Sequence, residues 1–424
     1  MISHSSNSSG FGLSPDSPHI LLLTQRAPFP PDRGDRIRSY NLLRQLSQHW
    51  NVSLACLNDE RVSDAQREEL ERICFRVAIE ENVGLGRWVR GLRSAARGRS
   101  LTEGLFQSNQ LASTITNWTT ETEFAAALVY CSSMMQYVEL PACSELPIVA
   151  DLVDVDSEKW LEHANRAKRS WKRPVYRFES KKVRLLEQEI ARRAKAITLV
   201  SDDEAKLFRT EVSRTTRVLG VANGVDATSF QAVKTKQDRP VELLFVGVLD
   251  YYPNVEGISW FVQDVLPELR DNLDFRMKIV GRKPNAAVLR LANENNVEVF
   301  GDVPDVRTYL DNADIVVAPL RLARGIQNKV LEAMACALPV VLTDAAATGI
   351  DGQDGEHFLV GDSAAQFALN IQQLAGKADL REHIGKSARN LVEQEYNWSS
   401  RLQPLVELLQ QITSTPQTET AVVR

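Results

Sequence analysis

Short apolar runs alternate with amphipathic stretches along most of this chain. A run of about four to eight apolar residues between turn residues is typical of a buried strand, and apolar positions that recur every three to four residues are typical of a helix. The runs form two series, at 19–23, 52–57, 126–131, 147–152 and 196–200, and at 241–248, 275–280, 297–300, 314–318 and 338–342. This alternation predicts an α/β fold with parallel sheets covered by helices.

Length and polar segments divide the chain. At 424 residues it is too long for one ordinary core, and two domains of about 200 residues are expected. The polar, unpatterned segment 234–240 predicts a linker between domains at 19–233 and 241–395. Residues 1–18 are rich in Ser, Gly and Pro, which predicts a disordered tail rather than a signal peptide. We therefore expect two Rossmann-like, doubly wound domains that face each other across a cleft.

Composition narrows the class of protein. The hydrophobic share of 43% and the charged share of 25% are typical of a soluble globular protein, and no apolar run approaches the ~20 residues of a membrane span. Five cysteines without metal-like spacing argue against a disulfide framework or a zinc site and favour the cytoplasm. Up to residue 230 there are 31 Lys and Arg against 29 Asp and Glu, and after it 19 against 26. This balance argues against a general nucleic-acid binder.

The stretch 320–341 places a turn and a helix directly after a buried strand. Gly325 breaks the chain, and from Ile326 apolar residues recur with helical spacing. At the carboxyl end of a parallel strand, the free N–H groups and the dipole of the next helix favour an anion. Arg324 and Lys329 add cations there, and Glu332 follows Lys329 on nearly the same helix face. These residues suggest a phosphate held by the lysine and the turn, and a sugar hydroxyl that donates to the glutamate.

The phrase RGIQNKVLEAMACALPVVLT resembles the donor-binding signature of GT-B glycosyltransferases, in particular the retaining, nucleotide-sugar-dependent, GT4-like group. The signature there is a Glu, seven residues and a second Glu. Glu332 matches the second Glu, which the resemblance assigns to the donor ribose. Arg324 stands at the position of the first Glu, so the expected contact to the transferred sugar is changed in this chain.

Three phrases, ARGIQNKVLEAMA, FVGVLDYYPNVEG and PPDRGDRIRSYNLL, resemble the sugar transferases associated with PEP-CTERM/exosortase exopolysaccharide loci, and this resemblance spans about residues 19–400. It implies a hexosyltransferase that needs no metal or further cofactor. The donor would be a nucleoside-diphosphate sugar, either a UDP- or a GDP-sugar, and the acceptor a lipid-linked or polysaccharide chain. It also implies a last helix, 396–412, that crosses back to the first domain before a frayed tail at 413–424.

The resemblance extends to individual donor-site residues. Many relatives carry Arg and Lys in the turn that begins at Gly247, but this chain has neither there, so Lys329, Arg324 and Arg282 are expected to hold the diphosphate. Asn254 is expected to cap the following helix. The expected donor-binding residues are Gly247, Asn254, Arg282, Gly325, Ile326, Gln327, Asn328, Lys329 and Glu332.

On the acceptor side, Gly34 and Asp35 resemble the glycine-rich loop of GT-B enzymes, although a plain βα turn explains them equally well. Asp154 follows a strand and is the candidate to polarise the acceptor hydroxyl or stabilise the transition state, with Asp151 and Asp156 as rivals. Alternatively, Asp156 or Ser157 only caps the next helix. With Arg324 and Lys329, Asp154 completes the predicted catalytic set. The DVD phrase also resembles a metal-binding DxD, but the surrounding pattern does not match that fold.

Two basic segments, 87–99 and 166–173, could rest on an anionic membrane at the inner face of the plasma membrane, or could simply be solvated helix faces. Two other functions stay open. A nucleotide-sugar 2-epimerase shares this fold but needs further carboxylates and a histidine in the cleft. A non-catalytic protein could bind a membrane or a partner through its basic first half.

Overall fold

The computed structural model describes residues 13–14, 16–31, 33–166, 172–227, 230, 240–303, 305–323 and 326–414. It divides into two compact units. The first comprises Met1–Ala222 and Leu402–Arg424, and the second comprises Asn223–Arg401. The division between the units falls after Ala222. The predicted linker at 234–240, except for residue 240, lies outside the described residues.

The first unit is built on a seven-stranded parallel sheet with the order β3-β2-β1-β4-β5-β6-β7. Consecutive residues of β1, from Ile20 to Leu23, are completely buried, as expected for a central strand covered by helices on both faces. The strands are β1 His19–Thr24, β2 Asn51–Asn58, β3 Arg76–Glu81, β4 Phe124–Tyr130, β5 Ile148–Val153, β6 Ala196–Leu199 and β7 Val218–Gly220.

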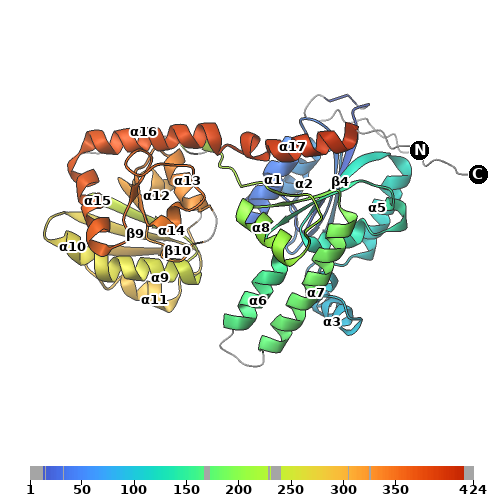
Figure 1. The fold of residues 1–424 in the computed structure, drawn as a ribbon, viewed down its shortest axis with the longest axis horizontal. Helices are drawn as coiled ribbons and strands as arrows, with labels where there is room; N and C mark the ends of the chain where they lie inside the picture. Colours follow the sequence, from blue (N-terminus) through green and yellow to red (C-terminus); the bar gives the residue numbers. More distant parts are fainter. Residues whose placement is uncertain are drawn as a thin grey trace, which may run out of the picture. The chain divides into compact units, whose positions relative to one another are not determined.

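The helices of the first unit include a long hairpin. Figure 1 shows α6 and α7 side by side and extending beyond the sheet. They divide the basic stretch 159–195, and most of the predicted segment 166–173 lies outside the described residues. The helices are α1 Gly34–Leu46, α2 Asp64–Ile73, α3 Gly86–Ala96, α4 Leu101–Leu105, α5 Asn109–Glu121, α6 Asp156–Arg166, α7 Lys172–Arg193, α8 Asp202–Glu211 and α17 Trp398–Ser414. From Leu402 onward, α17 belongs to this unit.

The second unit contains a six-stranded parallel sheet with the order β10-β9-β8-β11-β12-β13. In Figure 1, α9 and α11 lie on one face of this sheet and α13 and α16 on the other. The strands are β8 Val241–Val246, β9 Phe275–Gly281, β10 Val297–Gly301, β11 Ile315–Ala318, β12 Val340–Leu342 and β13 Leu359–Val360. The helices are α9 Tyr252–Trp260, α10 Leu266–Arg270, α11 Ala286–Leu291, α12 Arg307–Leu310, α13 Asn328–Ala335, α14 Asp344–Ala347, α15 Ala364–Gly376 and α16 Ala378–Glu395.

The chain between α9 and α10 widens into one π-helical segment, Phe261–Val265. Pro267 stands at the start of α10. Because proline lacks an N–H group and its ring clashes with the preceding helical turn, it interrupts a regular α-helix just before itself.

Each sheet has one place where the strand order reverses. In the first unit it lies between β1 and β4, and in the second between β8 and β11. Loops leave the two neighbouring strands in opposite directions at such a point, so a crevice opens at the carboxyl ends. These two crevices are therefore where the fold places a binding site in each unit.

Candidate functional site

At the reversal point of the second unit, glycines allow the loops after β8 and β9 to touch. A Cβ atom on Gly281 would lie 1.6 Å from the carbonyl oxygen of Gly247, so this backbone approach requires glycine. A Cβ atom on Gly247 would lie 3.2 Å from Nζ of Lys329 and 2.9 Å from Nδ2 of Asn254. Gly247 therefore leaves the space that the lysine occupies.

Lys329 lies at the second position of α13 and reaches across to the loop after β8. Its Nζ donates a hydrogen bond of 2.5 Å to Oδ1 of Asn254 and lies 4.9 Å from the centre of the Phe245 ring. Burial lowers the pKa of Lys329 to about 8, although the charge of Glu332 opposes this. Burial likewise raises the pKa of Glu332 to about 7, opposed by Lys329. Both groups thus titrate close to neutral pH, which is more common at functional sites than elsewhere.

Asn254 does not cap its helix, contrary to the prediction. Helix α9 begins at Tyr252, so Asn254 lies inside the first turn and is buried. Its Nδ2 donates to the carbonyl oxygen of Val248 at 2.9 Å while its Oδ1 accepts from Lys329. This asparagine therefore holds the turn after β8 and positions the lysine. Asparagine is a common N-cap residue, but α9 starts two residues before Asn254.

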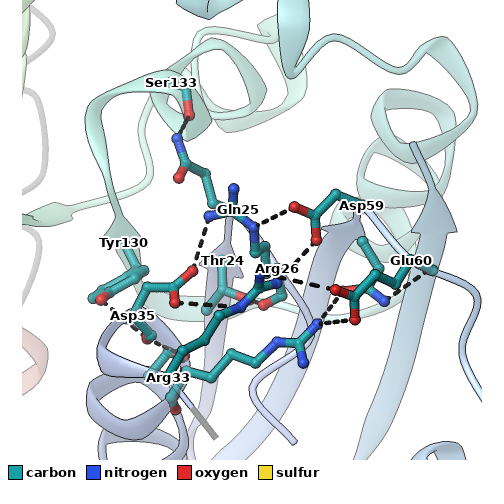
Figure 2. Close-up of polar contacts among 12 residues, drawn as sticks. Thr24, Gln25, Arg26, Arg33, Asp35, Asp59, Glu60, Tyr130 and Ser133 are labelled. Atoms are coloured by element: carbon teal, nitrogen blue, oxygen red, sulfur yellow. Dashed lines mark hydrogen bonds and ion pairs between the residues drawn. The ribbon is translucent and has the colours of Figure 1, made fainter. Parts of the chain in front are cut away.

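At the reversal point of the first unit, polar side chains connect the ends of β1 and β4, as Figure 2 shows. Nε2 of Gln25, just after β1, donates to Oγ of Ser133 at 2.6 Å. The hydroxyl of Tyr130, at the end of β4, donates to the carbonyl oxygen of Asp35 at 3.1 Å. The gap between the loops that leave β1 and β4 is thus lined by groups that can donate and accept hydrogen bonds.

Beside this gap, an ion-pair network fixes the Pro- and Gly-rich loop after β1 (Figure 2). Arg26 donates to Asp35 at 2.8 Å and to Asp59 at 2.9 Å, and Arg33 donates to Asp59 at 3.0 Å. Burial acts against ionisation of Asp59, but the hydrogen bonds from the two arginines lower its pKa. Gly34 is the first residue of α1, directly before Asp35.

The sequence indicated Gly34 and Asp35 here and missed Gln25, Arg26 and Asp59. Arg26 and Asp59 are far apart in sequence, and they meet only because β1 and β2 pair in parallel and end at the same edge. No local motif carries that information.

The three candidate aspartates after β4 differ in their surroundings. Asp151, in β5, is completely buried and accepts two hydrogen bonds from Arg38, at 2.8 and 3.1 Å. Such a bidentate, buried pair is a structural contact between α1 and the sheet. Asp151 is therefore not available to an acceptor.

Asp154 follows a tight turn with an unusual backbone. Val153 has φ of 70°, and the N–H of Asp154 donates to the carbonyl oxygen of Leu152 at 2.9 Å. A positive φ is costly for a β-branched residue and is found most often at functional sites. The side chain of Asp154 is one-quarter exposed and pairs with Lys159.

Asp156 and Ser157 do not cap α6, because the helix already begins at Asp156. The N–H of Ser157 instead donates to Glu187 at 3.0 Å, and the N–H of Val155 donates to Glu204 at 2.9 Å. Carboxylates from α7 and α8 thus take over the capping role. Burial raises the pKa of Asp156 to about 6, a shift that Lys159 opposes.

Residues 240–377 match the family described as Glycosyl transferases group 1. The matched residues make up about a third of the chain, and all of them lie in the second unit. The match spans all six described strands of the second sheet and includes Gly247, Asn254, Lys329 and Glu332, so the geometry described above lies within the matched residues.

Solved structures with the same two-domain GT-B fold resemble almost the whole chain. Sucrose-phosphate synthase from Thermosynechococcus elongatus superposes with a TM-score of 0.65 at 15% identity, over 93% of this chain and 99% of that one. HepE from Anabaena, solved in complex with UDP-glucose, superposes with a TM-score of 0.59 at 17% identity, over 93% and 99% of the two chains. These matches confirm the predicted fold class of two Rossmann-like domains.

A curated relative covers a similar length. It is an uncharacterized 44.6 kDa protein in the cps region of Klebsiella pneumoniae, 20% identical over 391 residues, which are 89% of this chain and 96% of the relative.

The other predicted donor-site residues of the second unit lie around the same crevice or outside the described residues. Gln327 immediately precedes α13 and Asn328 begins it. The sequence pattern predicted that the helix starts at Ile326, but it starts two residues later. Arg282 is exposed in the loop after β9, where its carbonyl oxygen accepts from the N–H of Leu249 at 2.8 Å. Arg324 and Gly325 lie outside the described residues.

The described part of the chain holds neither a cluster of metal ligands nor a membrane-spanning helix. No group of three or more His, Cys, Asp or Glu side chains is arranged there to hold a metal ion. No helix among the described residues is both long and apolar enough to cross a bilayer.

Proposed function

We propose that this protein transfers a sugar from a nucleoside-diphosphate sugar to a saccharide or lipid-linked acceptor. The observation that carries the proposal is Lys329, which occupies the space left by Gly247 at the reversal point of the second unit. A cation at the start of a helix, beside a glycine turn, is suited to a diphosphate. The fold shared with HepE, whose solved complexes contain UDP and UDP-glucose, supports a UDP-sugar as donor.

In this proposal each group has a separate task. Lys329 and the N–H groups at the start of α13 bind the diphosphate, with Arg324 and Arg282 as further cations. Glu332, three residues into the helix from Lys329, accepts a hydrogen bond from a ribose hydroxyl. Charge on the departing diphosphate grows as the sugar leaves, so the lysine stabilises the transition state more than the bound donor. Most of the remaining rate enhancement comes from positioning.

The acceptor side is proposed to lie in the first unit. Asp154, partly exposed after a strained turn and paired with Lys159, is the candidate to polarise the acceptor hydroxyl. Asp156, with a pKa raised by burial to about 6, is the alternative base. Retention of stereochemistry, independence from metals and a hexose as the transferred sugar follow from the family resemblance. The relative in a cps region supports a role in exopolysaccharide synthesis, including the PEP-CTERM/exosortase type.

A panel of nucleotides tests the function. We expect UDP or GDP, without added metal, to raise the melting temperature, whereas CMP, which lacks a diphosphate, should not. A ligand at about 100 times its dissociation constant adds ~2.7 kcal/mol to the free energy of unfolding, or a few degrees for a domain of this size. No shift with any nucleoside diphosphate would contradict the proposal. Conversion of the donor sugar without acceptor would identify an epimerase instead.

We also propose that α3 rests on an anionic membrane surface, at the inner face of the plasma membrane. Four large apolar side chains at helical spacing point into solvent there: Leu85, Trp88, Val89 and Leu92 are 82%, 56%, 56% and 66% exposed. Such an apolar strip on a helix that is also rich in arginine is typical of interfacial helices. Exposed apolar residues are otherwise costly to solubility.

Vesicle binding tests this contact. Replacing Trp88 and Leu92 with serine should weaken binding to vesicles that contain phosphatidylglycerol by at least about tenfold, because each side chain loses apolar contact with the lipid. Replacing Leu289 and Leu369 with serine is a matched control, since these residues are also about half exposed but lie in the second unit. Equal binding by both double variants would show that α3 is only a solvated helix.

A further inference from the structure

A polar pocket of about 540 Å³ lies where the end of β3 meets α3 and the beginning of α5. It opens beside β2, whose carboxyl end also carries the network around Asp59. All of its lining residues except Leu57 are polar or charged. The lining comprises Leu57, Glu80, Glu81, Asn82, Arg90, Arg93, Arg97, Gln107, Ser108, Asn109 and Gln110. The predicted donor and acceptor residues do not belong to this pocket.

Three arginines provide the positive side of the pocket: Arg90 and Arg93 of α3, and Arg97 directly after it. Arg90 is anchored, since it donates to Oδ1 of Asn82, whose Nδ2 donates to the carbonyl oxygen of Leu105 at 2.7 Å. Arg93 and Arg97 follow on the same helix face and are exposed, and the described part of the structure shows no hydrogen bond or ion pair from either guanidinium group. Two guanidinium groups are thus free to bind a ligand.

The acidic residues in the pocket do not neutralise these arginines directly. Glu81 accepts a hydrogen bond of 3.4 Å from the N–H of Val62. Burial raises the pKa of Glu80, and the cation that opposes this shift is Arg67, which does not line the pocket. The amide side chains of the first residues of α5 add hydrogen-bond donors. Guanidinium and amide groups together suit a phosphate with an attached sugar or polar headgroup.

Helix α3 is held firmly enough to fix its arginines. It packs on α4 so closely that a Cβ atom on Gly104 would lie 2.4 Å from the carbonyl oxygen of Arg90. Gly91 faces α4 as well and is buried. These glycines therefore serve close packing rather than flexibility. Because the helix is fixed, its exposed apolar strip and the three arginines keep constant positions relative to each other.

We propose that this pocket binds the phosphoryl group of a phosphorylated glycan or lipid headgroup. The apolar strip of α3 adjoins the arginines, since Val89 and Arg93 are four residues apart on the helix. Lipid can therefore contact the strip while its phosphoryl group enters the pocket. The inference rests on the proposed function in one respect, since it assigns this phosphoryl group to the acceptor of the transfer reaction.

Calorimetry with the full chain tests the pocket, with inorganic pyrophosphate and glucose 1-phosphate as soluble probes. The Lys329→Ala background removes competition from the donor site. The test variant is Arg93→Ala/Arg97→Ala. The control is Arg44→Ala/Arg72→Ala, which removes the same charge from exposed positions of α1 and α2 outside the pocket. We expect the dissociation constant to rise at least about tenfold in the test variant and less than about twofold in the control.

Binding to vesicles with and without phosphatidylglycerol distinguishes the sources. Soluble probes that bind through Arg93 and Arg97 identify a free phosphorylated glycan, whereas an arginine-dependent effect on anionic vesicles alone identifies a lipid headgroup. Equal loss in test and control variants, or no arginine-dependent binding in either assay, overturns the proposal. UDP binding should be unchanged in the test variant with Lys329 intact. If the wild type binds neither UDP nor GDP, the donor assignment fails while the pocket result still stands.

Discussion

Replacing Lys329 with alanine should weaken binding of the nucleoside diphosphate about 100-fold, because a hydrogen bond between charged groups contributes ~1.5–3 kcal/mol. The effect on turnover should be at least as large, since charge on the diphosphate increases in the transition state. Isothermal titration with the nucleotide selected by the panel measures the first effect, and initial rates measure the second.

The same variant should keep its stability. Burial lowers the pKa of Lys329 from 10.5 to about 8. Below about pH 8 the buried, charged lysine therefore reduces the free energy of unfolding. This cost disappears only as the pH rises toward 10.5, the pKa of the lysine in the unfolded chain. Removing the charge therefore should not lower the melting temperature. Loss of binding together with an unchanged melting temperature separates a binding role from a structural one.

The lowered pKa of Lys329 also predicts a pH dependence. From about pH 7.5 to about 9.5 the phosphate is fully ionised but the lysine loses its proton, so affinity for the nucleotide should fall about tenfold or more. The Lys329→Arg variant should lose this dependence, because arginine stays charged. Lys386→Ala, which removes an exposed lysine of α16 in the same unit, is the control. If Lys329→Ala binds the nucleotide as tightly as the wild type, Lys329 does not take part in nucleotide binding.

Replacing Asp151 with alanine should destabilise the protein by about 3–5 kcal/mol, because it removes the buried carboxylate that pairs with the guanidinium group of Arg38. Arg38 is 1% exposed and Asp151 is 0% exposed. Burial opposes the charge of Arg38, yet the interaction with Asp151 raises its pKa. Thermal denaturation should show a melting temperature lower by about 10 °C.

Two further variants control this experiment. Arg72→Ala breaks an exposed pair with Glu69 and should change stability by less than about 1 kcal/mol. Arg38→Met/Asp151→Leu removes both charges and should recover much of the loss, since apolar replacements of a buried pair are often tolerated. If Asp151→Ala melts like the wild type but loses turnover, Asp151 rather than Asp154 acts in the reaction.

Periodicity was sufficient to predict the fold class and most strands of both sheets. Central strands such as β1 and β8 are buried on both faces, so their sequences are continuous apolar runs that stand out from the helices around them. Strand β3, with the sequence RVAIEE, was missed because it lies at the edge of its sheet. An edge strand is only partly covered and tolerates charged residues.

The grouping of Lys329 with Glu332 was also readable from sequence, because residues three apart on a helix share a face. Their partners across the crevice, Gly247 and Asn254, were named from the family resemblance, and Asn254 was given the wrong local role. A capping preference depends on where a helix begins, and the tertiary structure moved that start to Tyr252.

Only the tertiary structure separated the three aspartates and connected Arg26 with Asp59. Asp151, Asp154 and Asp156 look alike in sequence, but one is buried against Arg38, one follows a strained turn and one begins a helix. Burial and long-range pairing set the chemistry of a carboxylate, and both arise when strands distant in sequence come together. The sequence by itself thus determined the layers of the fold and the local donor motif, whereas strand pairing decided which polar side chains meet.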